Sequence, residues 1–216
     1  MTLQHHPSEL ILTAYASGAL ADGPGLGVAM HLEHCAQCRA AVAAMEAVGG
    51  SLLDALDDAA MDGLALDQIM ARIERPAPAT RRAEPASDRR DLGIDVLPRA
   101  LQGRRIGPRR FVAPNLWVAH VHSNKPDGWR TYLLHAAPGQ GLLEHGHKGA
   151  ELTTVLTGAF RDETGVYCAG DFIECDSEVE HRPMVEGDQA CLCLITAEGS
   201  VEVRGLGRLL QPYLQV

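Results

Sequence analysis

The first third of the chain alternates apolar and polar positions with the period of an amphipathic helix. Between residues 7 and 75, apolar side chains recur three and four positions apart, so each group would line one face of a helix. Breaks at residues 18–27 and at Gly49-Gly50, the latter either a kink or a turn, divide the pattern into a small bundle of four helices. The apolar positions outnumber what so small a core can cover, and we infer a partner surface. They are Leu10, Ile11, Ala14, Tyr15, Val42, Met45, Leu52, Leu56, Leu66, Ile69, Met70 and Ile73.

A segment with almost nothing to bury follows the helical region. Residues 75–90 read RPAPATRRAEPASDRR, a composition that keeps a chain extended and solvated. We therefore expect a helical domain over residues 1–75, a linker over residues 76–95 and a second domain over residues 96–216.

Beyond residue 96 the apolar positions come in short runs typical of β-strands. Turn-forming residues at 126–128, 138–141 and 165 separate these runs at the spacing of a β-sandwich or barrel. The predicted fold class is α+β multidomain, a four-helix bundle followed by an all-β barrel. Strands are expected at residues 116–121, 130–136, 151–157, 159–161, from 185 onward, and at 190–196.

Composition and charge narrow the class of protein. With 46% hydrophobic and 22% charged residues the chain reads as a soluble globular protein, and it has no apolar run of about 18 residues to span a membrane. No secretory signal is visible at the N-terminus, so we expect a cytoplasmic protein. The charge is uneven. Residues 1–70 hold nine acidic side chains and one arginine, whereas residues 72–110 hold eleven arginines and five acidic side chains.

A first candidate metal site lies in the helical region. His31, Cys35 and Cys38 form the pattern H-x3-C-x2-C, which on a continuous helix over residues 30–45 would place all three side chains on one face. Two thiolates and an imidazole are three of the four ligands of a structural zinc site. For the fourth, His5 and His6 precede Pro7, where a helix could start, and we favour His6.

Two alternatives to this zinc site follow from the same residues. The two cysteines could be small core residues without a metal, because free cysteine is often buried. His34 fits the same helix face less well than His31 and is expected to be a neighbour of the site.

A second candidate metal site lies among the predicted strands. His145 and His147 would point to the same side of a strand, and Glu151 follows after a short turn. His181 could add a fourth ligand from a neighbouring strand. Three histidines and one glutamate suit zinc, manganese, iron or nickel, and this set of ligands does not choose among them.

The remaining cysteines do not indicate a disulfide-stabilised secreted scaffold. Such scaffolds are short, whereas this chain has 216 residues and places its C-x2-C beside a histidine. Cys191 and Cys193 would face the same side of a strand, either as buried filler or as redox-reactive thiols. Cys168 and Cys175 have no assigned role.

Together these motifs resemble known families. Residues 139–158 look like the first motif of the cupin superfamily, and residues 170–181 are similar to the second, although the usual Pro-x-Gly is replaced by Asp176-Ser177-Glu178. Residues 1–75, with H-x3-C-x2-C and an upstream histidine, resemble the zinc-binding anti-sigma domain. In this order, the two parts resemble the ChrR family of anti-sigma factors over nearly the whole chain.

The resemblance implies a function and a division of labour. The helical domain, with zinc on His6, His31, Cys35 and Cys38, would hold an extracytoplasmic-function sigma factor in a 1:1 complex. The cupin-like domain, with a metal on His145, His147, Glu151 and His181, would release that factor under oxidative stress such as singlet oxygen. The acidic helical region agrees with this function, because a sigma factor carries basic surfaces for DNA.

Two rival functions remain from the sequence. One is a metal-dependent cupin enzyme, a dioxygenase or isomerase, with the zinc-stapled helices as a docking domain. In that case Glu144 and Glu174 are possible acid or base groups. The other is direct DNA binding by the arginine-rich linker, which two acidic flanking domains make the less favoured reading.

Overall fold

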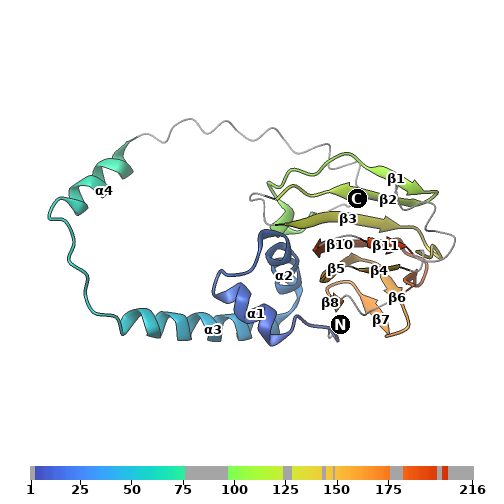
Figure 1. Cartoon of the computed structure of the whole chain (residues 1–216), viewed down its shortest axis with the longest axis horizontal. Coiled ribbons are helices and arrows are strands. Elements are labelled where there is room, and N and C mark those ends of the chain that lie inside the picture. Colours follow the sequence, from blue (N-terminus) through green and yellow to red (C-terminus); the bar gives the residue numbers. More distant parts are fainter. Residues whose placement is uncertain are drawn as a thin grey trace.

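The computed structural model describes residues 3–75, 97–123, 128–142, 145–147, 149–175, 182–198 and 201–203. Four helices come first, as the hydrophobic pattern predicts, and a short 3-10 helix and eleven strands follow (Figure 1). The helices are α1 (Glu9–Ala16), α2 (Asp22–His34), α3 (Ala36–Asp54), α4 (Ala65–Glu74) and η2 (Arg99–Leu101). The strands are β1 (Arg110–Ala113), β2 (Leu116–His120), β3 (Trp129–Ala136), β4 (His145–His147), β5 (Glu151–Thr157), β6 (Ala159–Arg161), β7 (Val166–Cys168), β8 (Phe172–Cys175), β9 (Met184–Val185), β10 (Cys191–Glu198) and β11 (Val201–Val203).

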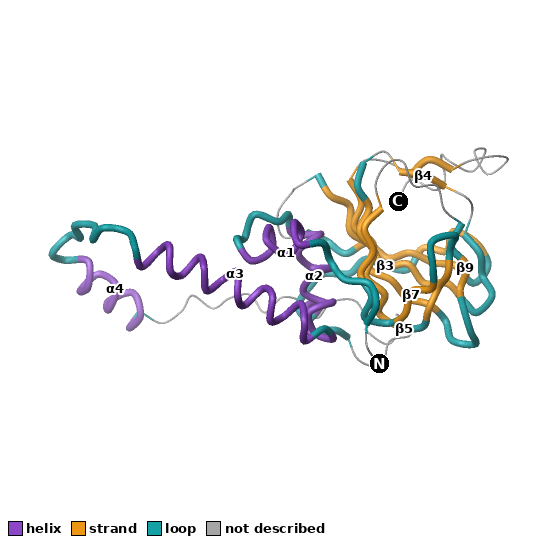
Figure 2. Tube along the Cα trace, turned by 90° about the horizontal axis from the view of Figure 1, so that it is seen from below, coloured by secondary structure: helices purple, strands orange, loops and turns teal. Residues whose placement is uncertain are grey.

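The four helices do not share one core. The helices α1, α2 and the first half of α3 pack together around Leu12, Val28 and Val42. The second half of α3 projects away from the strands, and α4 lies apart and buries none of its residues (Figures 1 and 2). The apolar face of α4 is therefore exposed in the isolated chain.

Two expected helix breaks are placed differently in the structure. Gly49-Gly50 lies inside α3, so it does not form a turn that ends the helix. The break expected over residues 18–27 is shorter, because α2 already begins at Asp22 and contains three further glycines. Among the described residues, no helix is both long enough and apolar enough to cross a membrane.

The strands form one large antiparallel sheet and two small ones. The order in the large sheet is β1-β2-β3-β10-β5-β8, and β7-β6-β9 and β11-β4 form the other two. Of the expected strands, those at 151–157 and 159–161 match β5 and β6, and those at 116–121, 130–136 and 190–196 correspond to β2, β3 and β10 with ends shifted by one or two residues. The strand expected from residue 185 onward is wrong in its extent, because β9 already ends at Val185. The strands β1, β7 and β11 are among those that the periodicity does not predict, and each has only three or four residues.

The central strands of the large sheet are buried on both faces. In β10, Cys193 and Ile195 face the core beneath β6 and β7, whereas Leu192 and Leu194 face the core beneath α2 and η2. This explains the continuous apolar run in β10, since a strand covered on both sides has no solvent face to keep polar. The helix α2 is thus a layer of the β-domain as well as a member of the helical region.

Glycines allow α2 to approach the sheet closely. A Cβ atom on Gly23 would lie 2.5 Å from Oγ1 of Thr131, and a Cβ atom on Gly27 would lie 3.1 Å from Oγ1 of Thr154. The Thr154 hydroxyl donates a hydrogen bond to the Gly27 carbonyl at 3.2 Å. Larger residues at these two positions would push the helix off the strands.

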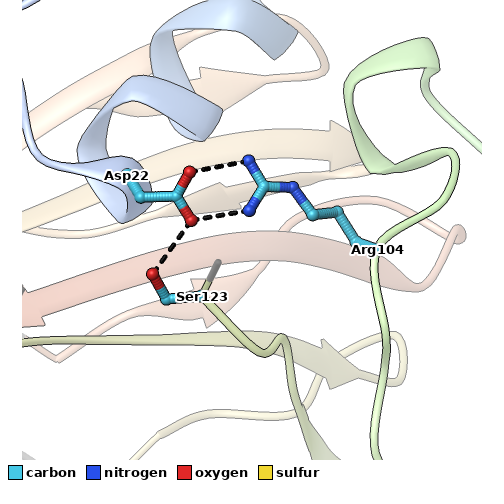
Figure 3. A network of polar contacts seen from close by, with 3 residues as sticks. All are labelled: Asp22, Arg104 and Ser123. Carbon is cyan, nitrogen blue, oxygen red and sulfur yellow. Dashed lines mark hydrogen bonds and ion pairs between the residues drawn. The ribbon is translucent and has the colours of Figure 1, made fainter. Parts of the chain in front are cut away.

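A polar network fixes the N-terminal end of α2 (Figure 3). The Arg104 guanidinium donates to both carboxylate oxygens of Asp22 at 2.6 and 2.8 Å, and the Ser123 hydroxyl donates to one of them at 2.9 Å. The hydrogen bond to Asp22 raises the pKa of Arg104. The network joins the first residue of α2 to the segments before β1 and after β2.

Candidate metal centre

Four side chains from the N-terminal segment and the α2–α3 junction meet beside the turn between β7 and β8. His6, His31, Cys35 and Cys38 each bring one ligand atom, and these atoms lie within 4.8 Å of one another. Nδ1 of His6 is 3.4 Å from Nε2 of His31 and 3.4 Å from each sulfur, and Nε2 of His31 is 3.3 Å from the Cys38 sulfur. A tetrahedral zinc site places its ligand atoms about 3.3 to 3.8 Å apart. Four of the six distances between the ligand atoms therefore match a tetrahedral site, and all six lie within 4.8 Å.

A break between α2 and α3 sets the positions of the Cys35 and Cys38 sulfurs in the cluster. The prediction of one continuous helix over residues 30–45 is wrong at Cys35, whose φ of −106° and ψ of 104° are extended. Cys35 becomes the N-cap of α3, and its sulfur accepts a hydrogen bond from the Cys38 amide at 3.4 Å. Both sulfurs thus lie at the N-terminal end of a helix, where the helix dipole favours a thiolate.

The orientation of His31 is set by the β-domain. Its ring is completely buried, and Nδ1 donates a hydrogen bond to the Gly170 carbonyl at 2.7 Å. This contact assigns the proton to Nδ1 and leaves the lone pair of Nε2 facing the cluster, as in many metal-binding histidines. Burial lowers the pKa of His31 and outweighs the opposite effect of the hydrogen bond, so the neutral ring that a metal requires is favoured.

The Cys35 and Cys38 thiols would both lose their protons only with a cation bound between them. Burial, and then contact with the Cys35 thiol, raise the pKa of Cys38 to about 12. A dication coordinated between the sulfurs would reverse this effect, because a coordinating thiol is deprotonated outright. Two buried sulfurs, the buried imidazole of His31 and the half-buried imidazole of His6 are a donor set that fits structural zinc.

His6 reaches the cluster from the segment that precedes α1. Ser8 is the N-cap of α1 and accepts a hydrogen bond from the Ile11 amide, so Pro7 lies before the helix and not in its first turn. The neighbouring His5 points elsewhere and packs against the Tyr167 ring, with centroids 4.4 Å apart. His34 is exposed and outside the cluster.

The second predicted site is described only in part. His145 and His147 lie in β4, which pairs with β11, but their side chains and all of His181 lie outside the described residues. Glu151 begins β5, and its side chain is buried beside a cavity of ≈ 40 Å³ lined mostly by apolar groups. Burial raises the pKa of Glu151 to about 8. A buried carboxyl at this position is compatible with the predicted ligand role, which stays a prediction.

The Cys191 and Cys193 thiols line the same cavity. They face the same side of β10, as predicted, and their sulfurs lie 3.6 Å apart. The contact with Cys191, and then burial, raise the pKa of Cys193. The Cys193 thiol is thus held in the protonated form, which reacts least with oxidants.

Sequence reasoning missed the residues that support the first site from the β-domain. Asp171 and Glu174 accept hydrogen bonds from the backbone on either side of His6, and Gly170 accepts one from His31. The dipeptide Gly170-Asp171 is visible in the sequence as a turn. Its partners lie more than 130 positions away, so no local pattern connects them.

The comparisons with known proteins agree with this architecture. The sequence profile described as the ChrR cupin-like domain matches residues 110–202. Over its full length the chain is 39% identical to the anti-sigma-E factor ChrR of Cereibacter sphaeroides, with 228 aligned residues that cover 100% of each protein. It is also similar to a crystal structure of Rhodobacter sphaeroides SigE in complex with the anti-sigma ChrR. There the identity is 36% and the TM-score 0.72, with 91% of this chain and 100% of that chain covered.

The fold and the site define a class: a helical module with a candidate metal centre, packed on a cupin-like β-domain. The relationship over the full length is more specific. The chain belongs to the ChrR family of anti-sigma factors, as its motifs predict.

Proposed function

We propose that this protein is a cytoplasmic anti-sigma factor that sequesters an extracytoplasmic-function sigma factor in a 1:1 complex. It would release that factor under oxidative stress such as singlet oxygen. The family supports the first part, since one relative is named for this activity and another was solved with SigE. The role is regulatory rather than enzymatic, and contact is with the sigma factor rather than with nucleic acid.

The observation that carries the proposal is an apolar strip over residues 48–73. It runs along the second half of α3 and through α4, and each of its side chains is at least 47% exposed. A soluble protein rarely leaves so many large apolar side chains uncovered unless a partner covers them. The strip consists of Val48, Leu52, Leu53, Leu56, Met61, Leu64, Leu66, Ile69, Met70 and Ile73.

Charge around the apolar strip suits the same partner. Five acidic side chains lie between residues 54 and 67. A sigma factor presents basic surfaces that otherwise contact DNA, and complementary charge speeds encounter and sets the register of binding. The buried apolar contacts would supply the affinity.

The first metal site would hold the start of α3, the helix that leads into the apolar strip, in a fixed position. Zinc on His6, His31, Cys35 and Cys38 would cross-link the start of α1 to the α2–α3 junction. The helix α3 would then leave the site in one direction and carry the apolar strip. Zinc, or manganese, iron or nickel, on His145, His147, Glu151 and His181 would form the sensing site.

Binding can be tested by co-purification with a sigma factor encoded beside this chain. Replacing both Ile69 and Ile73 with Asp should reduce the recovered complex at least tenfold, because both lie in the exposed strip of α4. Phe111→Asp is the control, since Phe111 is equally exposed on β1. Full binding by the double variant, or an equal loss with Phe111→Asp, would refute this role for the strip.

The division of labour is tested with a sigma-dependent reporter. Glu151→Ala should bind the sigma factor and repress the reporter but respond weakly to singlet oxygen. Cys35→Ala should leave the reporter active in all conditions. The opposite pair of results would reverse the assignment of binding and sensing, and oxygen uptake by the iron- or manganese-loaded protein would favour the enzyme instead.

A further inference from the structure

The segment that carries His6 is fastened to the cupin-like domain on both sides of that residue. Before it, the amides of Gln4 and His5 donate to Oδ1 of Asp171 at 3.2 and 3.3 Å. After it, the Ser8 amide and hydroxyl donate to the two carboxylate oxygens of Glu174 at 2.6 and 3.1 Å. We call residues 3–8 the N-terminal strap.

The strap also has a backbone contact with β8. The Phe172 amide donates to the His5 carbonyl at 3.1 Å. Among the described residues, the hydrogen-bonding contacts of the His6 ring itself are with the cluster. The position of the fourth ligand therefore depends on β8.

Asp171 is itself held firmly. Its carboxylate is almost fully buried, and Oδ2 accepts a hydrogen bond from the Cys168 amide at 2.8 Å. This bond closes the turn between β7 and β8 and leaves Oδ1 directed at the strap. A buried carboxylate fixed on one side is a precise anchor for the backbone on the other.

Gly170, which precedes Asp171, also lies against the N-terminal strap. Gly170 has a φ of +97°, and a Cβ atom there would lie 2.8 Å from Leu3 and 3.3 Å from Cβ of His34. Its carbonyl accepts the hydrogen bond from His31. One turn of the cupin-like domain thus contacts the ligand His31 directly and the backbone next to the ligand His6.

We propose that Asp171 is a positioning residue of the helical metal centre and that the β7–β8 turn, with β8, is its outer shell. The inference rests on the proposed metal site. Both domains would then form the first metal site, whereas the H-x3-C-x2-C motif alone places that site in the helical region. The metal affinity of the helices is then a property that the cupin-like domain controls.

The strand β8 lies between the first metal site and Glu151 of the second candidate site, so it can connect the two. It pairs with β5 from Phe172 to Cys175, and Cys175 lies opposite Glu151, the candidate ligand of the second site. A shift of β8 that follows a change around Glu151 would move Asp171 and Glu174, and with them the strap. By linkage, a metal ion at the first site would stabilise β8 to the same extent.

The test measures the affinity of the full-length protein for Zn²⁺ by competition with a chromophoric chelator. Asp171→Ala should weaken Zn²⁺ binding about tenfold to a hundredfold, the usual effect of losing an outer-shell partner. Asp171→Asn keeps one acceptor oxygen and should retain most of the affinity. The control is Asp162→Ala, because Asp162 accepts backbone hydrogen bonds from Thr164 and Gly165 in the neighbouring β6–β7 turn.

A double-mutant cycle separates positioning from general destabilisation. If Asp171 acts through His6, Asp171→Ala should cost little further affinity in a His6→Ala background. The Co²⁺-loaded protein gives a second readout, since loss of the His6 nitrogen should change the visible spectrum in the same way in both single variants. Additive losses, or an Asp171→Ala protein with the affinity and spectrum of the parent, would overturn the inference.

The same experiment distinguishes failure of the inference from failure of the metal site. If the parent protein binds no Zn²⁺ in a manner that depends on Cys35 and Cys38, the site itself is wrong. If it binds Zn²⁺ and Asp171→Ala matches Asp162→Ala, only the positioning role is wrong. Sigma-factor binding is not part of either readout.

Discussion

The ring of His31 donates a hydrogen bond to the backbone carbonyl of Gly170 at 2.7 Å. The two residues are 139 positions apart, and the contact joins a ligand of the helical metal centre to a turn of the cupin-like domain. It orients the imidazole and is buried, so losing it would leave an unsatisfied polar group. The metal centre and the β-domain are therefore mechanically connected.

Loss of a cysteine ligand should unfold the helical region. We expect Cys35→Ala to lose one equivalent of zinc and to lower the free energy of unfolding by more than about 3 kcal/mol. The reason is that structural zinc contributes on the order of 10 kcal/mol to the folding of small domains. Elemental analysis and chemical denaturation check this. Cys168→Ala, outside the cluster, should retain the zinc, and an equal loss there would contradict the assignment.

Close packing of α2 on the sheet predicts opposite effects for two neighbouring glycines. Gly23→Ala should destabilise the protein by about 1 to 3 kcal/mol, because the new methyl group would overlap the Thr131 hydroxyl. Gly25→Ala meets nothing within 4 Å on the same helix and should stabilise it by about 0.5 to 1 kcal/mol. Thermal denaturation of both variants measures the difference. Equal midpoints would show that α2 does not rest on β3 as described.

The Asp22–Arg104 pair should contribute to stability despite its partial exposure. Its side chains are 21% and 17% exposed, and the contact is bidentate. Arg104→Ala should cost about 1 to 3 kcal/mol, since it leaves a half-buried carboxylate with fewer partners. Arg105→Ala is the control, because the exposed Arg105 side chain donates a hydrogen bond to the exposed His122 ring at 3.1 Å, and its backbone bond to the His122 amide would remain. A cost below about 0.5 kcal/mol for Arg104→Ala in urea denaturation would reduce the pair to an ordinary surface contact.

Local patterns predict the elements of this fold well and their packing poorly. The strand at residues 151–157 is predicted with its bounds because a run rich in β-branched residues and flanking turns are local properties. The packing of α2 against the sheet is not predicted. Gly23 and Gly27 look like helix breakers until their neighbours Thr131 and Thr154 are known. Glycine in a helix can mark a break or a close approach, and only tertiary contacts distinguish them.

The candidate site shows the same limit. The identities of His31, Cys35 and Cys38 follow from their spacing, because few other arrangements bring two sulfurs and an imidazole together. His6 is a choice between two adjacent histidines, and the sequence offers His5 as the alternative. The geometry of the site does not follow from the spacing, because Cys35 is extended and not part of a continuous helix as expected. Support from Asp171 depends on contacts across most of the chain, which one sequence does not display.

Removal of the metal should loosen the N-terminal strap and β8 together. The Phe172 amide is protected by the His5 carbonyl, next to the ligand His6. When a chelator strips the metal, His6 loses its anchor and hydrogen exchange at Phe172 should accelerate at least tenfold, which corresponds to about 1.4 kcal/mol of lost protection. The Leu194 amide is the internal control, because it lies in β10, which pairs with β3 on one side and β5 on the other. Mass spectrometry of short peptides, or amide-resolved NMR, can compare the two. Faster exchange in β10 as well would indicate general unfolding, and unchanged exchange at Phe172 would show that the metal centre and β8 are energetically independent.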